Sequence, residues 1–175
     1  LLSVAGKVAK FGGWSVDIDT YNSYWSDEVC NIHEVPMGYS PDVNEGINFY
    51  APEYKDLITK AFTDCAKSGI PYDLELQIIT AKGNRVWVRT IGEAVKDAKG
   101  KIVQVQGAFK DISALKKSEL ALIESEKKYR ALIESSQDAI FIDQNKKFVY
   151  INPACINILG AKSEEALLGK SPLDF

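Results

Sequence analysis

Hydrophobic and polar residues alternate along several stretches of the first 113 residues, which is the period-two pattern of half-buried strands. The alternating stretches begin near Trp14, Tyr24, Asp73, Arg85 and Val103. Turn sequences at Lys82-Gly83-Asn84 and Asp97-Ala98-Lys99-Gly100 separate the last three of them. The pattern therefore predicts a five-stranded antiparallel sheet.

Between the second and third of these strands the apolar residues change to helical spacing. Ser26 is placed to cap a short helix. Pro52 opens a longer helix, because proline suits the first helical position, and Gly69 ends it. The apolar face of the longer helix consists of Tyr54, Leu57, Ile58, Ala61, Phe62 and Cys65. We predict an α+β fold with short helices on one face of the sheet.

Helical spacing returns after Ser113. Leu115, Leu122 and Tyr129 follow one another seven residues apart, which is typical of a coiled coil. The stripe is barely three heptads long, so an amphipathic helix packed on its own domain is the alternative.

The beginning of the chain occurs twice. Residues 12–34, moved forward by 126 positions, fall on residues 138–160 without a gap, and Asp17, Tyr24 and Asn31-Ile32 then meet identical residues. Both segments run strand, turn, strand and capped helix. Self-similarity at a fixed offset predicts tandem domains.

Composition and charge exclude several classes of protein. The chain has 175 residues, a net charge of −3 and 46% hydrophobic residues, so it can bury a core but lacks the basic face of a nucleic-acid binder. No apolar stretch approaches the length of a membrane span. Three separated cysteines and one histidine fit a reducing cytoplasm and argue against a metal site. Because the chain begins at Leu1, we expect it to be a piece of a longer protein.

The order of these elements, with the residues that fill them, resembles the PAS family. In the first copy the matching residues are Gly13-Trp14, Asp17, Phe49-Tyr50-Ala51-Pro52-Glu53, Tyr72-Asp73-Leu74-Glu75, Gly83, Trp87-Val88-Arg89, Gly107 and Asp111-Ile112-Ser113. The last of these resembles the C-terminal PAC motif of sensor kinases, with serine in place of threonine. In the second copy they are Asn152-Pro153-Ala154 and Gly160.

The resemblance implies a PAS fold with a ligand pocket between the sheet and the helices. It divides the chain into an N-terminal helical segment (1–11), a PAS domain (12–113), a linker helix (114–136) and the first part of a second, truncated PAS domain (137–175).

The cofactors of the family are tested residue by residue. Light-sensing members attach flavin through a cysteine, and Phe49 takes its place here. Their polar flavin contacts correspond to Ile78, Val88 and Phe109. Haem-binding members ligate iron through a histidine on the long helix, but residues 53–68 contain none, and His33 lies in the earlier short helix. We predict neither flavin nor haem, and an unknown small apolar ligand remains possible.

The expected lining of the pocket is almost entirely apolar. The candidate ligand-pocket residues are Ile58, Phe62, Leu74, Leu76, Ile78, Val86, Val88, Thr90, Val105 and Phe109. Either these side chains simply fill the core, or they enclose a small cavity for an apolar or aromatic metabolite.

Two further sets of residues are candidates for function. Candidates for signal relay are Asp111, Ile112, Ser113 and Arg89. Candidates for a homodimer surface are Trp87, Ile91, Leu115, Leu122 and Tyr129. We hypothesise that Asp111 anchors the linker by a hydrogen bond to Arg85 or Arg89.

The sequence thus predicts a cytoplasmic sensory and relay module that is not itself an enzyme. It would bind a small ligand or partner and pass the change through the linker helix to an output domain, most simply that of a two-component histidine kinase. The alternatives are a ligand-free dimerisation module and the sensor of a cyclic-dinucleotide enzyme.

Overall fold

A computed structural model describes residues 11–174 of the chain, so the N-terminal helix expected at residues 1–11 falls, apart from Phe11, outside the described residues. Phe11 begins the first strand. The chain divides into two compact units, residues 1–117 and 118–175, and each is described by itself.

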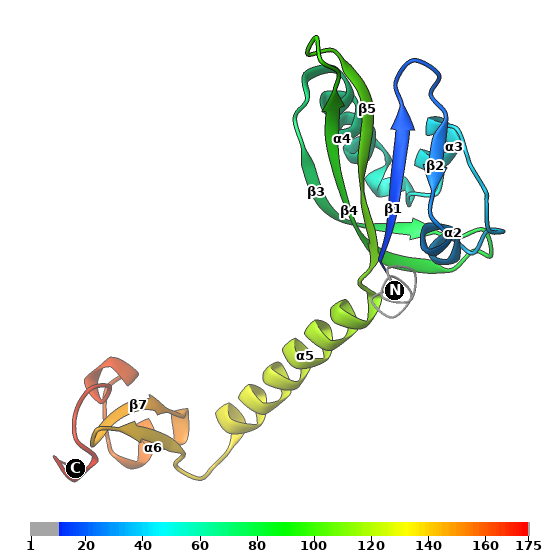
Figure 1. The fold of residues 1–175 in the computed structure, drawn as a ribbon. Coiled ribbons are helices and arrows are strands. Elements are labelled where there is room, and N and C mark those ends of the chain that lie inside the picture. The colour runs from blue at the N-terminus through cyan, green and yellow to red at the C-terminus, as the bar shows by residue number, and fades with distance from the viewer. Residues whose placement is uncertain (1–10, 175) are drawn as a thin grey trace. The chain divides into compact units, whose positions relative to one another are not determined.

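The first unit is built on the predicted five-stranded antiparallel sheet, with the strand order β2-β1-β5-β4-β3 (Figure 1). The strands are β1 (Phe11–Asp17), β2 (Ser23–Trp25), β3 (Tyr72–Ile79), β4 (Arg85–Lys96) and β5 (Ile102–Asp111). The last strand pairs with both β1 and β4, so the chain leaves the sheet from its centre.

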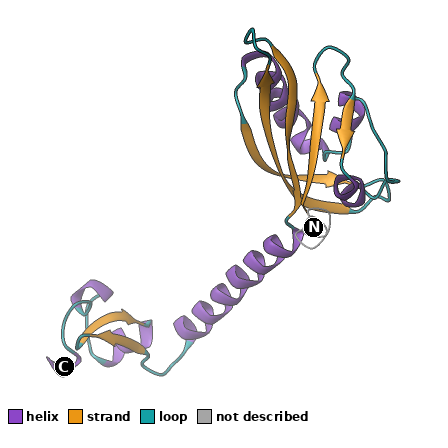
Figure 2. Cartoon of the chain, viewed as in Figure 1, coloured by secondary structure: helices purple, strands orange, loops and turns teal. Residues whose placement is uncertain are grey.

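The connection between β2 and β3 carries the short helices of this unit, joined by loops (Figure 2). They are α2 (Asp27–His33), α3 (Val43–Asn48), the 3₁₀ turn η1 (Pro52–Tyr54) and α4 (Lys55–Ser68). The predicted opening at Pro52 is confirmed, because η1 runs directly into α4. Gly69 ends α4 in the left-handed conformation, with its N–H bonded to the carbonyl of Cys65.

The core lies between these helices and one face of the sheet. Val29 of α2 and Ile58 of α4 pack in one cluster with Leu76, Val88 and Phe109 of the three long strands. Each fully buried side chain of this size stabilises the fold by about 1.5–3 kcal/mol. The alternation seen in the sequence therefore marks the inner face of the sheet.

Two glycines on the inner face leave room for aromatic rings. A Cβ atom on Gly92 would lie 2.4 Å from the ring of Tyr72. One on Gly107 would lie 1.7 Å from the carbonyl oxygen of Ile91 and 3.0 Å from the ring of Trp14. The two rings stack across the sheet with their centroids 6.5 Å apart. Glycine is therefore required at 92 by the Tyr72 ring and at 107 chiefly by the neighbouring backbone.

The helix α5 (Ser113–Ser135) follows β5 after one residue. Two ion pairs four residues apart lie along it, Glu124 with Lys128 at 2.9 Å and Glu126 with Arg130 at 3.1 Å. No helix within residues 11–174 is both long and apolar enough to cross a membrane.

The second unit repeats the start of the first, as predicted. It contains β6 (Phe141–Gln144), β7 (Lys147–Ile151), α6 (Pro153–Ile158), and the 3₁₀ turns η2 (Glu164–Ala166) and η3 (Pro172–Asp174). The two strands pair antiparallel, and Asn152 caps α6 where Ser26 precedes α2. A small core of Phe148, Ile151, Cys155 and Leu167 holds the unit together.

Candidate functional site

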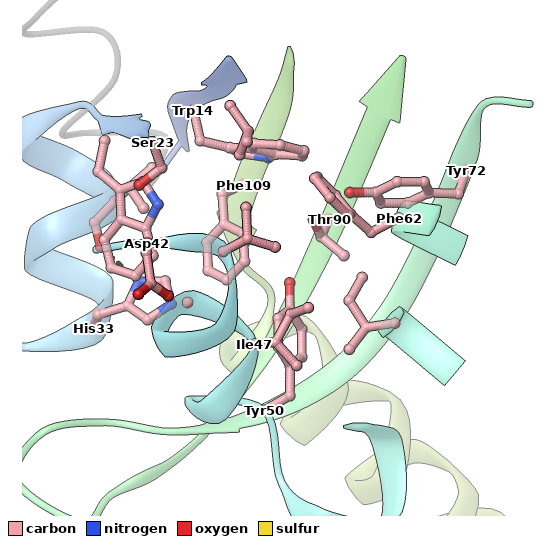
Figure 3. Close-up of a pocket in the computed structure, with 16 residues that line it drawn as sticks. Trp14, Ser23, His33, Asp42, Ile47, Tyr50, Phe62, Tyr72, Thr90 and Phe109 are labelled. Carbon is pink, nitrogen blue, oxygen red and sulfur yellow. Dashed lines mark hydrogen bonds between the residues drawn. The ribbon is translucent and has the colours of Figure 1, made fainter. Parts of the chain in front are cut away.

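A cavity of about 70 Å³ lies between the helices and the inner face of the sheet (Figure 3). Its apolar walls are formed by Trp14, Val16, Trp25, Val29, Val43, Gly46, Ile47, Ile58, Phe62 and Phe109. Its polar lining residues are Ser23, His33, Asp42, Tyr50, Tyr72 and Thr90. The cavity thus joins aromatic walls to a few polar groups, which is the usual character of a ligand pocket.

Four of the ten candidate ligand-pocket residues line this cavity, namely Ile58, Phe62, Thr90 and Phe109. The others lie in or beside the packed core: Leu74, Leu76, Ile78, Val86, Val88 and Val105. Residues 49–51 pair with the free edge of β3, because Ile79 donates to the carbonyl of Phe49 and Ala51 donates to that of Gln77. The side chains of Tyr50 and Ile58 pack in the same buried cluster as Leu76, Ile78 and Val88, so packed side chains fill that part of the inner face.

Sequence reasoning placed Thr90 in the pocket but missed the other polar residues of the cavity. Tyr72 shares the inner register with Leu74 and Leu76, so the alternation along β3 contained a signal for it. His33 lies four residues after Val29, and both are buried on the inner side of α2. In so short a helix the buried side is set by tertiary packing, which periodicity alone does not reveal.

The imidazole of His33 is only 1% exposed. Its Nδ1–H donates to the carbonyl oxygen of Val29 at 2.8 Å, which makes Nε2 the acceptor nitrogen. The ring lies between those of Trp25 and Phe109, at centroid distances of 4.2 and 4.8 Å. Burial lowers the pKa of His33 to about 4, so the ring is neutral at pH 7.

Three hydroxyl groups gather at another part of the cavity (Figure 3). The hydroxyls belong to Thr90, Tyr50 and Tyr72. Burial raises the pKa of Tyr50 to about 12 and also raises the pKa of Tyr72, so both phenols keep their protons. The cavity lining is therefore uncharged apart from Asp42.

The end of α2 is tied to the hairpin between β3 and β4. The backbone N–H of Ala81 donates to the carbonyl of His33 at 3.0 Å. The carboxylate of Glu34 accepts from the hydroxyl of Thr80 and, at 2.7 Å, from Asn84. These hydrogen bonds lower the pKa of Glu34. A displacement of His33 is thus mechanically linked to the start of β4.

The start of α5 is joined to β4 at Trp87. The N–H of Ile112 donates to the carbonyl of Trp87 at 2.9 Å, and the N–H of Trp87 donates to the hydroxyl of Ser113 at 3.1 Å. The carboxylate of Asp111 accepts from the N–H of Ser113 at 2.8 Å. The ring of Trp87, half-buried, lies 5.6 Å below the ammonium group of Lys116.

The remaining candidates lie on the outer face of the sheet. Arg89 donates to both carboxylate oxygens of Asp73, and Arg85 pairs with Glu53 at 2.7 Å. A hydrogen bond from either arginine to Asp111 stays a prediction. Ile91 is half-buried in an open outer groove.

The predicted dimer residues of α5 are exposed: Leu115 by 53%, Leu122 by 71% and Tyr129 by 65%.

Comparison with known proteins finds two family matches in this chain. A family model described as the PAS fold matches residues 22–109, and a second, described as a PAS domain, matches residues 127–175. Each match falls on one of the two repeated parts of the chain.

Among the similar proteins is the probable diguanylate cyclase DgcE of Escherichia coli, 23% identical over 167 residues that cover 95% of this chain and 15% of that protein. The sensor protein FixL of Bradyrhizobium diazoefficiens is 22% identical, over 89% of this chain and 31% of that protein. A sensory box histidine kinase/response regulator structure from Burkholderia thailandensis superposes with a TM-score of 0.56 and 25% identity, over 75% of this chain and 98% of that one. The chain thus spans less than a third of these two curated relatives.

Proposed function

The chain belongs to the PAS family, and we propose that its first unit senses a small molecule in the cavity and passes the change to α5. It is a signalling sensor module with no catalytic domain of its own. The output domain of the whole protein would be that of a two-component histidine kinase. Similarity to a probable diguanylate cyclase keeps the cyclic-dinucleotide alternative open.

One observation carries the proposal: the cavity and the start of α5 share the same two strands. Phe109 of β5 lines the cavity, and α5 begins four residues later at Ser113. Thr90 of β4 lines it too, and Trp87 of the same strand holds Ile112 and Ser113. A shift of either strand would therefore move the first turn of α5. Coupling between two sites requires an element with two discrete arrangements, and the first turn of α5 is that element here.

The test is to measure output in the whole protein with the Trp87→Ala substitution. Output is autophosphorylation or cyclic-dinucleotide synthesis, according to the domain present. We expect the basal activity to change at least fivefold, because the substitution removes the indole ring that packs below Lys116 at the start of α5.

Val95→Ala is the matched control, since Val95 is half-buried on the same face of β4 but away from α5. It should leave output within twofold. Equal effects of the two substitutions would contradict a relay through Trp87.

We also propose a parallel homodimer through α5. The exposed stripe of Leu115, Leu122 and Tyr129 would be buried between two helices at heptad spacing. Light scattering of the chain should give the mass of a dimer, and replacing Leu122 with Glu should give a monomer. A monomer of the unchanged chain at high concentration would contradict the proposal.

A ligand-free relay is the second candidate, and the cavity size favours it. Pockets for drug-sized ligands usually measure about 300–1,000 Å³, and the cavity here has about 70 Å³. Native mass spectrometry against the denatured mass distinguishes the candidates: a retained extra mass supports sensing, and a bare dimer supports relay alone. Three buried free cysteines suit a reducing compartment, in keeping with a cytoplasmic module.

A further inference from the structure

One acceptor atom in the cavity lacks a partner among the described residues. His33 makes a single hydrogen bond there, through Nδ1, so the lone pair of Nε2 is unused. Within residues 11–174, no fully shielded side-chain nitrogen or oxygen lacks a hydrogen bond. Nε2 is therefore not fully shielded, and because His33 is 1% exposed and lines the cavity, its access is from the cavity.

The other polar groups of the cavity have donors or acceptors close at hand. The hydroxyls of Thr90, Tyr50 and Tyr72 gather in one part of the cavity, where each can serve a neighbour as donor or acceptor. The hydroxyl of Ser23 donates to the carbonyl of Pro41, and Asp42 accepts from the N–H of Glu45 at 2.8 Å. An incoming molecule therefore gains most at His33, where a buried acceptor is still unpaired.

The lining restricts the charge of that molecule. No lysine or arginine of the described residues lines the cavity, and Asp42, which is exposed at its rim, is the carboxylate among them. An anion would be desolvated without a counter-charge and would meet Asp42 on entry. A buried cation would face a neutral imidazole, because Asp42 remains in solvent. A neutral molecule carries neither cost.

The volume restricts its size. A cavity of about 150 Å³ accommodates benzene, so one of about 70 Å³ has room for only a few non-hydrogen atoms. Trp25, Phe109 and Ile47 offer apolar contact to the rest of the molecule. So few atoms bring little binding free energy, and dissociation constants in roughly the high micromolar to millimolar range follow.

From these observations we infer that the cavity binds a small neutral organic molecule whose O–H or N–H donates a hydrogen bond to Nε2 of His33. Short-chain alcohols are the simplest members of this class. The inference rests on the sensory function proposed above and gives that function its ligand chemistry.

The test uses the whole 175-residue chain labelled with ¹⁵N. His33 is the single histidine, so its two ring nitrogens are identified without assignment. The probes are 2-propanol, acetone and acetate, which share a branched skeleton of four non-hydrogen atoms. They differ in being a neutral donor, a neutral acceptor and an anion.

We expect 2-propanol to move the Nε2 resonance saturably towards the frequency of a protonated nitrogen, while Nδ1 changes little. Acetone and acetate should bind at least tenfold more weakly. Signals near Leu159, which takes the place of His33 in the second copy, should change only linearly and so report the general solvent effect. No saturable shift of Nε2, an equal shift with acetone, or saturation by acetate would each overturn the inference.

Two substitutions test the acceptor. His33→Leu should abolish the saturable response of the Trp14 and Trp25 indole signals to 2-propanol. Val95→Ala, on the outer face of β4 and outside the cavity lining, should keep the dissociation constant within threefold. Equal binding by both variants would show that His33 is not the acceptor. If either variant fails to fold, the titration of the unchanged chain remains the deciding test.

Failure of this inference is distinguishable from failure of the proposed function. The Trp87→Ala comparison measures the relay without any ligand. If Trp87→Ala alters output while the Nε2 resonance does not respond to 2-propanol, the relay function stands and the ligand belongs to another chemical class.

Discussion

The two PAS copies carry their buried polar side chains at different positions. In both copies, the residue that precedes the first helix makes two hydrogen bonds to a backbone residue near the start of the first strand. Ser26 donates its N–H to the carbonyl of Gly13, and its hydroxyl accepts from the N–H of Gly13 at 3.1 Å. Asn152 makes the same pair with Ile140, each bond 2.9 Å long.

Asn152 makes further bonds that a serine hydroxyl has no atoms to make. Its amide nitrogen donates to the carbonyl of Ile133 in the last turns of α5 at 3.0 Å and to that of Asp138 at 2.9 Å. Its oxygen also accepts from the N–H of Cys155 at 3.0 Å. The second copy therefore uses its buried polar group to hold the helix that precedes it.

The first copy keeps its unpaired acceptor inside the cavity. His33 offers Nε2 there, whereas the corresponding position of the second copy is the apolar Leu159. The two copies thus use a buried polar side chain differently. In the first copy His33 keeps an acceptor for a ligand, and in the second copy Asn152, with all its hydrogen bonds made, holds α5.

The largest effect is expected from Asn152→Ala. Four hydrogen bonds to backbone groups are lost from a fully buried side chain, and each group left unpaired costs about 1–3 kcal/mol. We expect the second unit to lose about 4 kcal/mol, seen as faster amide exchange at Ile140 and Cys155.

Ser26→Ala is the matched change in the first copy. It removes one hydrogen bond and should cost about 1 kcal/mol. If Asn152→Ala and Ser26→Ala caused similar losses of stability, the two residues would not differ in the way described above.

A smaller effect is expected from pH, through His33. Its pKa is about 4 in the folded chain and about 6.5 when unfolded, so the unfolded chain gains a proton first as the pH falls. Stability from this group is therefore lost between pH 6.5 and pH 4, by about 3 kcal/mol, and is unchanged above pH 7.

Urea unfolding at several pH values, compared with His33→Leu, measures that loss. The variant should lack this part of the pH dependence, and subtracting the two curves removes the contribution of the carboxylates. Parallel curves for the two proteins would mean that His33 is not held neutral by burial.

The smallest effect is expected from Arg89→Ala. Arg89 and Asp73 form a cross-strand pair on the outer face, with both side chains nearly half exposed, and solvent screens such pairs. The urea midpoint should hardly move at neutral pH. A fall as large as that of the buried polar groups would break the contrast between surface charges and the polar groups inside the two copies.

Much of the fold could be predicted, because the local spacing of apolar residues determines where most strands and helices lie. Period two along β3, β4 and β5 reveals the inner face. The helical spacing of α4 reveals the buried residues Ile58, Phe62 and Cys65, although Leu57 of the same predicted face is 47% exposed. The position of β5 between β1 and β4 depends on contacts far apart in the sequence, which periodicity does not contain.

The cavity was less predictable for the same physical reason. Alternation assigns Leu76, Ile78 and Val88 to the inner face, but the side chains of Tyr50 and Ile58 pack against them, and the cavity lies elsewhere on that face. The acceptor role of His33 follows from its bond to Val29, a contact that only the folded helix makes.

The central claim is that occupancy of the cavity reaches the first turn of α5. Hydrogen exchange at the amides of Ile112 and Lys116, which bond to Trp87 and to Ile112, measures it directly. When 2-propanol saturates the His33 signal, we predict that exchange at these amides changes several-fold, and that Trp87→Ala removes the change. Unaltered exchange at a saturated His33 would contradict the account.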